Sequence, residues 1–361
     1  MLSTDFLFDY TLYGIIGLYL VVLARVFYFA NDLPSKGWIG IAVLCWPFFM
    51  LDEWVRLWDL QMLIPVFGLS DAFGVLLLTC CYRAVKSLLV LTPSRRFRLW
   101  WPFVVTAVIQ SFVVFIPESE KLLWLDASPS GSPLLLWPVY LSSLCAGFSI
   151  LLLGIFITEH VHLYHRHLPE QVVDVQEFRV SKLAGVMAFT VGVAFSSILL
   201  VTAAMFGFFE LPIWESLHHV ILGGPLLLCL LLLSFKRTTS PSPLDYERLE
   251  HLDIKPAQMR EVITLAEQAM IDQKAYKEIG LTLASFCRKA NIDPTTLAMA
   301  LQFQVKKNFR SFVYHYRLEY AKKVLLRTDT KIAKVAKRLG LNSEKFLSDV
   351  LVKHLRNNPS L

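Results

Sequence analysis

Long apolar stretches recur through the first 235 residues, and they constrain the fold more than any other feature of the chain. A helix needs about 20 apolar residues to cross the roughly 30 Å hydrocarbon core of a bilayer. Seven stretches reach that length, at residues 10–30, 38–58, 62–82, 99–117, 134–157, 183–207 and 213–235. In the second, the charge-free part ends at Leu51 and meets Asp52, Glu53 and Arg56, so an interfacial turn is the alternative to a full span there. We therefore predict an all-α fold in which residues 1–235 form a seven-helix transmembrane bundle.

The distribution of Lys and Arg predicts the orientation of this bundle, because cytoplasmic loops are enriched in both. With the N-terminus outside, the outer loops hold only Arg56 and Lys121. The inner loops then hold Lys36, Arg83, Lys86, Arg95, Arg96, Arg98, Arg166, Arg179, Lys182, Lys236 and Arg237. An odd number of spans with the N-terminus outside places everything after residue 235 in the cytoplasm.

Composition and charge divide the chain into two unlike halves. With 55% hydrophobic and only 18% charged residues, it differs from soluble domains, which carry about 25% charge. Its six cysteines show no Cys-x-x-Cys spacing and indicate neither a disulfide framework nor a zinc motif. Residues 1–235 hold 12 basic and 16 acidic residues, a net of −4, and residues 236–361 hold 23 and 13, a net of +10. From Lys274 onward the chain has 18 basic residues, Arg317 among them, and 6 acidic ones. The resulting net charge of +12 is typical of polyanion binding.

Two connecting segments follow the last span. Residues 236–256 contain two prolines in Thr-Ser-Pro-Ser-Pro and are predicted to be a juxtamembrane linker. Residues 257–278 have apolar residues at helical spacing, with Pro256 suited to a first turn. We expect this connecting helix to transmit motion, or to form a homodimer contact, between the membrane and the domain at 279–361.

The last domain contains a divergent internal duplication. Leu283, Phe286, Cys287 and Ala290 recur 49 residues later as Ile332, Val335, Ala336 and Leu339. Each set forms one face of a short amphipathic helix, and each is followed by a residue that tolerates positive φ, Asn291 or Gly340. A new helix then begins, with Asp293 capping and Pro294 at its first position in one copy and with Ser343 capping in the other. The pattern predicts two helix-turn-helix units, joined by one long helix from Arg310 to Arg327.

At these positions the chain resembles the AraC-type family of bacterial transcription regulators. The matching residues are Leu281-Thr-Leu-Ala-Ser-Phe-Cys287, Ala290-Asn-Ile-Asp-Pro294, Leu297, Leu301, Tyr316-Arg-Leu-Glu-Tyr-Ala-Lys-Lys-Val-Leu-Leu326, Ile332-Ala-Lys-Val-Ala336, Leu339-Gly340 and Pro359. The resemblance covers about 80 residues and implies a DNA-binding domain of two helix-turn-helix units. It also implies a bacterial inner-membrane location, since a multi-span N-terminal half occurs in this family.

The candidates for DNA contacts are residues on and around the two recognition helices. They are Thr295, Thr296, Met299, Gln302, Lys306 and Lys307 in the first unit and Lys331, Lys334, Lys345, Ser348, Asp349 and Lys353 in the second. Family members carry a basic residue about midway along each recognition helix, where this chain has Met299 and Asp349. An Asp there repels phosphate, although it can accept from a cytosine amino group. Phosphate affinity is therefore the stronger prediction and base readout the weaker.

Ionisable residues inside the apolar stretches are candidates for sensing, because they are costly in a membrane. Asp71 lies near the middle of the third stretch, and Glu215, His218 and His219 lie in the outer part of the seventh. They predict a ligand-sensing or proton-sensing pocket, with helix-to-helix hydrogen bonding as the alternative. His162 and His165 have the spacing of metal ligands, but no further ligand pair accompanies them, so we expect a solvated loop. No metal site and no cofactor is predicted.

Three functions remain as hypotheses. The first is a membrane-embedded one-component transcription regulator, not an enzyme, whose partners are DNA, the lipid bilayer and an unidentified small-molecule or protein signal. The second is a membrane receptor or scaffold whose degenerate helix-turn-helix domain binds protein. The third, a membrane enzyme or transporter, has the least support, because the chain has no phosphate-binding glycine loop, no His-Glu-x-x-His and no nucleophile motif.

Overall fold

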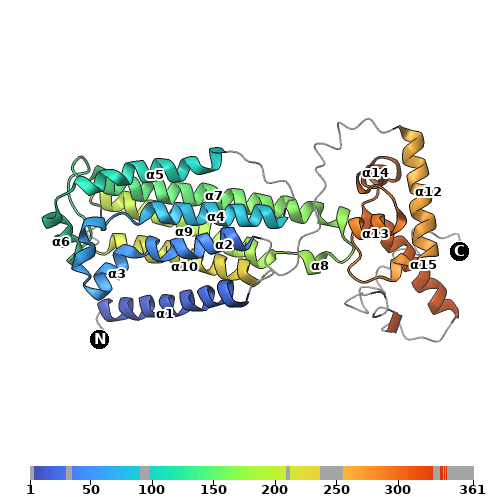
Figure 1. Ribbon diagram of the computed structural model, residues 1–361, viewed down its shortest axis with the longest axis horizontal. Helices are drawn as coiled ribbons and strands as arrows, with labels where there is room; N and C mark the ends of the chain where they lie inside the picture. Colours follow the sequence, from blue (N-terminus) through green and yellow to red (C-terminus); the bar gives the residue numbers. More distant parts are fainter. Residues whose placement is uncertain are drawn as a thin grey trace. The chain divides into compact units, whose positions relative to one another are not determined.

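The computed structural model describes residues 4–29, 35–89, 97–208, 212–235 and 255–327, together with 334, 335, 337 and 339. Helices and turns make up these residues, with no strand among them and one isolated bridge, between Val172 and Thr282. The chain divides into two compact units (Figure 1). The first contains Met1–His162 and Val180–Thr239, and the second contains Leu163–Arg179 and Ser240–Leu361. Each unit is described by itself below.

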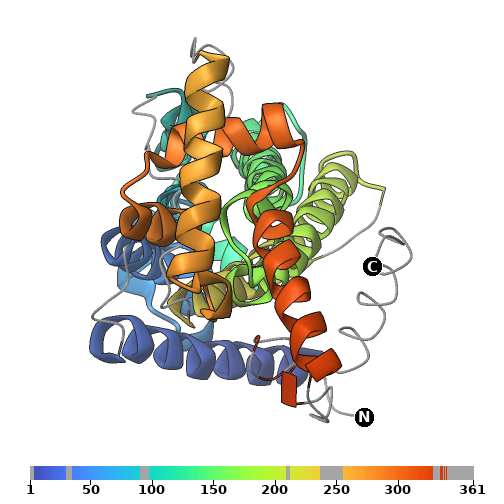
Figure 2. The same ribbon diagram turned by 90° about the vertical axis from the view of Figure 1, so that its right-hand side faces the viewer.

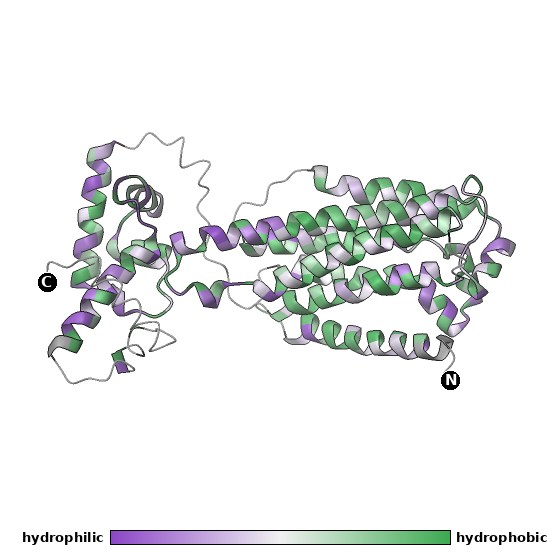
Figure 3. Ribbon diagram, turned by 180° about the vertical axis from the view of Figure 1, so that it is seen from behind, coloured by the Kyte–Doolittle hydropathy of each residue, from purple (hydrophilic) through white to green (hydrophobic). Residues whose placement is uncertain are grey.

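The first unit is a bundle of mainly apolar helices, labelled in Figure 1 and green over most of their length in Figure 3. Its elements are α1 (Thr4–Ala24), η1 (Arg25–Phe29), α2 (Lys36–Phe49), α3 (Leu51–Trp58), η2 (Gln61–Val66), α4 (Asp71–Leu89), η3 (Phe97–Trp100), α5 (Trp101–Ser111), η4 (Phe112–Phe115), α6 (Glu118–Asp126), α7 (Trp137–Gln171), α9 (Ser181–Met205) and α10 (Trp214–Phe235).

Four helices in the described residues are long and apolar enough to cross a membrane: Phe8–Tyr28, Trp137–Gln171, Ser181–Met205 and Trp214–Phe235. Two bent pairs raise the number to six if each counts as one span, Lys36–Phe49 with Leu51–Trp58 and Trp101–Phe115 with Glu118–Asp126. Their bends are 45° and 105°. The predicted count of seven is not confirmed.

Two predicted stretches are interrupted in the structure. The stretch 38–58 bends between α2 and α3, near Pro47 and where its charges begin, and its charged end forms the helix α3. The stretch 62–82 is not one helix: η2 contains Pro65, Gly68 has a φ of +81°, and α4 begins only at Asp71. Proline and a left-handed glycine end a helix, so Asp71 is the first residue of α4 and not the middle of a span.

Helix α10 packs against α9, α2, α1, α4 and α3. Close approach between helices depends on small residues. A Cβ at Gly74 would lie 2.6 Å from the Phe49 ring, and one at Gly223 would lie 2.7 Å from Met50 Sδ. Membrane bundles rely on such contacts because lipid gives little hydrophobic drive for helix association. The charged side chains discussed below are therefore enclosed by closely packed helices.

The structure corrects the prediction for the segment that contains His162 and His165. His162 and His165 were expected in a solvated loop, but α7 continues through them to Gln171. No proline or glycine occurs between Gly154 and Pro169, so nothing in this stretch ends the helix. Only the part of α7 after His162 belongs to the second unit.

The second unit contains this part of α7, α8 (Val175–Phe178), α12 (Pro256–Asp272), η5 (Ala275–Lys277), α13 (Leu283–Ala290), α14 (Pro294–Ala300), η6 (Leu301–Val305) and α15 (Phe309–Arg327). Figure 2 shows α12 and α15 as its two long helices. One core holds Phe286, Leu297 and Phe312 together with Ala266 and Met270 of α12. The predicted connecting helix is thus packed into the same core as α13 and α14.

The second predicted helix-turn-helix unit lies almost wholly outside the described residues, as do residues 236–254 of the linker predicted at 236–256. Of its first helix, Val335 and Leu339 are described, and they pack against Leu318 and Ala321 of α15. The Leu339 amide donates to the Val335 carbonyl at 3.1 Å, as in a helix. Two complete units are not confirmed.

Candidate functional site

The first helix-turn-helix unit begins with a well-capped α13. Thr282 Oγ1 accepts from the Ser285 amide at 3.1 Å, and Ser285 Oγ accepts from the Thr282 amide at 3.1 Å, which forms a capping box. Leu283, Phe286 and Cys287 face the core. The helix ends at Asn291, whose φ of 54° is left-handed. The turn residue inferred from the sequence therefore has the predicted conformation.

The predicted recognition helix, α14, begins as the sequence indicates. Asp293 is its N-cap, with Pro294 next, and the Asp293 carboxylate accepts from the Thr296 amide at 2.8 Å and from its hydroxyl at 2.7 Å. A cap of this kind stabilises a helix by about 1 kcal/mol. The helix continues through the π-helical turn η6 to Lys306, which is left-handed with a φ of 53°. Gln302 and Phe303 lie on this extension and are exposed.

The predicted DNA contacts of the first unit differ in accessibility. Gln302, Lys306 and Lys307 are exposed, and Thr295 and Thr296 are half-buried. Met299 is only 3% exposed, so this structure argues against the direct base contact that was expected of it. In the second unit Lys334 is exposed. The candidates that lie outside the described residues are Lys331, Lys345, Ser348, Asp349 and Lys353.

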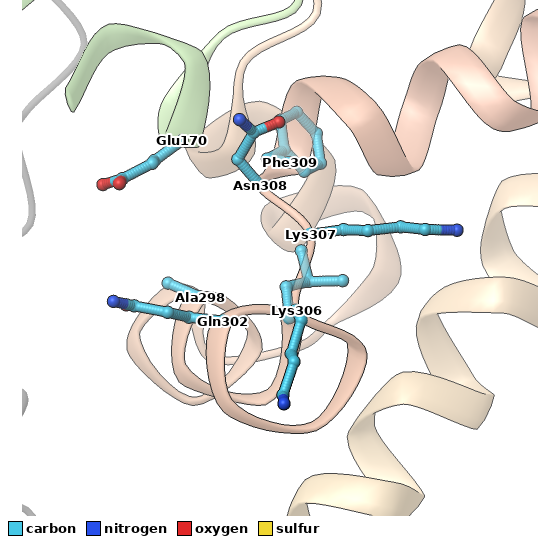
Figure 4. A pocket seen from close by; sticks show the side chains of 8 residues that line it. Glu170, Ala298, Gln302, Lys306, Lys307, Asn308 and Phe309 are labelled. Carbon is cyan, nitrogen blue, oxygen red and sulfur yellow. The ribbon is translucent and has the colours of Figure 1, made fainter. Parts of the chain in front are cut away.

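A cavity of about 250 Å³ adjoins the recognition helix (Figure 4). Ala298, Leu301, Gln302 and the segment from Lys306 to Phe309 line it, together with Glu170 at the end of α7. Figure 4 shows Glu170 across the cavity from Lys307, while Lys306 and Lys307 point in different directions. An acidic side chain from α7 is thus part of the surface that carries three predicted DNA contacts.

Arg317 is the least expected residue of this unit. It is 1% exposed and does not contribute to a basic surface. Its Nη1 lies 3.3 Å from Asp174 Oδ1, while Nε and Nη2 donate to the carbonyls of Tyr276 and Glu278 at 2.9 and 2.7 Å. Asp174 Oδ2 also accepts from the Gly280 amide at 2.7 Å. Arg317 therefore fastens the segment between α7 and α9 to the helix-turn-helix core.

Burial also raises the pKa of two groups in this core. It raises the pKa of the Cys287 thiol to about 12, and Asp293 adds to the effect. It raises the pKa of the Tyr316 phenol to about 12, with a smaller contribution from Glu267. Both groups are neutral near pH 7, as an apolar core requires.

A second candidate site lies inside the first unit, where the structure brings together the four predicted sensing residues. Asp71 of α4 faces His218 and His219 of α10, with Asp71 Oδ1 3.3 Å from His218 Nε2 and 3.5 Å from His219 Nε2. Glu215 pairs with Arg56, which lies 3.0 Å from Glu53. All of these side chains except Arg56 are buried.

Sequence reasoning missed several members of this polar cluster. Glu53 Oε1 lies 3.1 Å from His219 Nδ1, and Ser70 Oγ donates to Asp52 at 2.5 Å. Asp52 and Glu53 had been assigned to an interfacial turn, and Arg56 to an outer loop. The available signal was that three charges occur within five positions of an otherwise apolar stretch.

Comparison with known proteins bears on the second unit alone. No curated protein and no solved structure matches the chain. Residues 286–361 match the protein family described as a helix-turn-helix domain, a class of DNA-binding regulators. The capped helices α13 and α14, with the left-handed turn between them, lie in or directly before this range. Residues 286–361 of this chain therefore match a helix-turn-helix domain of the AraC type.

Proposed function

We propose that this chain is a membrane-embedded one-component transcription regulator. The observation that carries the proposal is the helix-turn-helix match over residues 286–361, together with the capped geometry of α13 and α14. In such a unit the second helix enters the major groove of DNA while the first crosses the backbone. A second unit, formed by residues 332–351, then contacts the next groove of the same duplex.

Membrane embedding is supported by the apolar helices of the first unit and by the loop charges. With seven spans, the loop charges favour an N-terminus outside and a DNA-binding domain in the cytoplasm, and the resemblance to bacterial regulators favours the inner membrane. The buried cluster around Asp71, His218 and His219 is the sensing site. The segment from Leu163 to Arg179 carries the response, because it joins two apolar helices and packs with the helix-turn-helix domain.

The DNA contacts in the first unit are made by Gln302, Lys306 and Lys307, with Thr295 and Thr296 at the start of the helix. Gln302 reads base edges, and the two lysines bind phosphate. In the second unit, DNA contacts are made by Lys331, Lys334, Lys345, Ser348, Asp349 and Lys353.

The experiment is to map the genomic DNA that crosslinks to the intact protein in cells. We expect a limited set of enriched sites. Gln302→Ala should reduce this enrichment. The matched control Gln268→Ala, at an exposed position of α12, should leave it intact. On a recovered fragment, replacing Lys306 and Lys307 together with alanine lowers the slope of log affinity against log salt by about 2, at about 0.9 per phosphate. If the intact protein enriches no sites, or if Gln302→Ala and Gln268→Ala behave alike, the proposal fails.

A further inference from the structure

The cluster around Asp71 contains buried atoms that no described residue satisfies. Asp71 Oδ1 and His218 Nε2 both lack a hydrogen bond of acceptable geometry in the described part of the chain, although they lie 3.3 Å apart. Asp71 is 4% exposed and His218 is fully buried. Buried polar groups are nearly always satisfied, because an unmet partner is costly. Two such atoms that face the same point indicate a missing partner between them.

The geometry of the three side chains fits a metal ion. Asp71 Oδ1, His218 Nε2 and His219 Nε2 can each offer a ligand atom, and one ligand atom from each of the three residues lies within 4.8 Å of the others. Ligands at 2.0–2.1 Å from a tetrahedral Zn²⁺ lie about 3.3 Å apart. The Asp71 oxygen lies 3.3 and 3.5 Å from the two imidazole nitrogens, close to that edge length.

Every one of these three ligands is held by a second polar group. His218 Nδ1 lies 2.6 Å from Ser197 Oγ, and His219 Nδ1 lies 3.1 Å from Glu53 Oε1. Asp71 Oδ2 accepts from Ser142 and Ser143 at 3.1 and 2.8 Å. Metal-binding histidines commonly bond through their other ring nitrogen in this way, which fixes the tautomer and aims the ligand atom. Of the three converging atoms, Asp71 Oδ1 and His218 Nε2 have no other partner in the described part of the chain, whereas His219 Nε2 also lies 3.0 Å from Ser70 Oγ.

A proton alone does not account for the arrangement. If His219 is protonated, Glu53 and Ser70 satisfy its two N–H groups, at 3.1 and 3.0 Å, while His218 Nε2 stays unmet. Charging both imidazoles would put two cations side by side, since the ring centres are 5.4 Å apart.

The charge of the cluster points the same way. With neutral imidazoles the four carboxylates of Asp52, Glu53, Asp71 and Glu215 exceed by two the nearby cations, which are Arg56 and the buried Lys121 that interacts with Asp52. A divalent cation balances this excess without protonating either imidazole. Buried charge requires compensation of this kind.

From these observations we infer that Asp71, His218 and His219 bind a divalent transition-metal ion of the zinc class. Imidazole with carboxylate suits Zn²⁺ and its neighbours better than Ca²⁺ or Mg²⁺. Three protein ligands leave a fourth tetrahedral position for water or an external ligand. The inference names the ligand of the proposed sensing site, but metal binding itself does not depend on DNA binding.

The test uses the full-length protein in detergent, purified with a histidine-free tag, stripped with a chelator and dialysed against Zn²⁺ alone. Elemental analysis should find one zinc per chain in the wild type, and bound zinc should raise the thermal unfolding temperature. The double variant His218→Ala/His219→Ala should lose that zinc. The control His162→Ala/His165→Ala removes as many imidazoles from α7 and should retain it.

The isosteric variant Asp71→Asn keeps the inference testable if the double variant misfolds. We expect it to elute as wild type in gel filtration and to bind zinc at least 10-fold more weakly. The inference is overturned if stripped wild type takes up no zinc, or if Asp71→Asn and the double variant bind as wild type does. The zinc measurement contains no DNA, so the two proposals fail separately. A chain that binds zinc but enriches no genomic sites refutes only the proposed regulator function. A chain that enriches genomic sites but binds no zinc refutes only the metal site.

Discussion

Arg317 illustrates what a single residue does in this fold. The sequence counts it as one of 18 basic residues in a polyanion-binding region, yet it is buried against Asp174 and two carbonyls. Whether a cation faces solvent or the core depends on what packs over it, and here the covering residues come from far along the chain. Composition gives the sum of the charges and not their exposure.

We predict that Arg317→Ala destabilises the second unit by about 3–5 kcal/mol, because it leaves the Asp174 carboxylate, whose side chain is only 12% exposed, without its cation. Lys323→Ala, at an exposed site on the same helix, should change stability by less than about 0.5 kcal/mol. Pulse proteolysis of the full-length protein across a urea series measures both. Equal midpoints for the two variants would contradict the buried role of Arg317.

The Cys287 thiol predicts a dependence of stability on pH. Its pKa is about 12 in the folded chain and near 9.0 unfolded. Above pH 9 the unfolded chain loses this proton while the folded chain keeps it, so the unit loses stability as pH rises from about 9 to 12. Cys287→Ala should lose less stability than the wild type between pH 9 and 10.5. The loss that remains above pH 10 should come from Tyr316, which the variant retains. Unchanged pH dependence in Cys287→Ala would refute the assignment.

At the scale of elements, local sequence determines where the recognition helix begins. Asp293 and Pro294 set its start, and Asn291 takes the left-handed conformation that the tight turn needs. These signals act over three or four residues, so they are readable without the fold. The extent of α4 is different, because Pro65 and Gly68 interrupt an apolar run that hydropathy alone treats as continuous.

Asp293→Ala should therefore lower the stability of the second unit by about 1 kcal/mol, since the Thr296 amide and hydroxyl lose their acceptor. Asp293→Ser retains a capping oxygen and should recover most of this loss. The same urea series provides the comparison. A serine variant as unstable as the alanine variant would show that the cap is not the cause.

At the scale of the whole molecule, residues 163–179, which form the end of α7 and most of its connection to α9, belong to the compact unit of the helix-turn-helix domain. The Val173 amide donates to the Leu281 carbonyl at 3.1 Å, and Asp174 holds Gly280 and Arg317. In the proposed regulator, this contact is the route by which a signal reaches α13.

We predict that Asp174→Ala increases amide hydrogen exchange at Gly280 and Leu281 by at least 10-fold, because the Gly280 amide loses its carboxylate acceptor. Asp174→Asn keeps one oxygen for that amide and should have a smaller effect. Arg166→Ala, exposed in the same segment, should have none. Exchange that is unchanged in Asp174→Ala would exclude the contact as a link to the DNA-binding domain.

The sequence by itself determined the all-α class, the division into an apolar and a basic half, and the caps and turn of the first helix-turn-helix unit. These features depend on hydropathy and on interactions between residues close in the chain. The tertiary structure alone brought Asp71 of α4 against His218 and His219 of α10, and Asp174 against Arg317. Such contacts join positions about 145 residues apart, and no local pattern encodes them, because they exist only once the helices have packed.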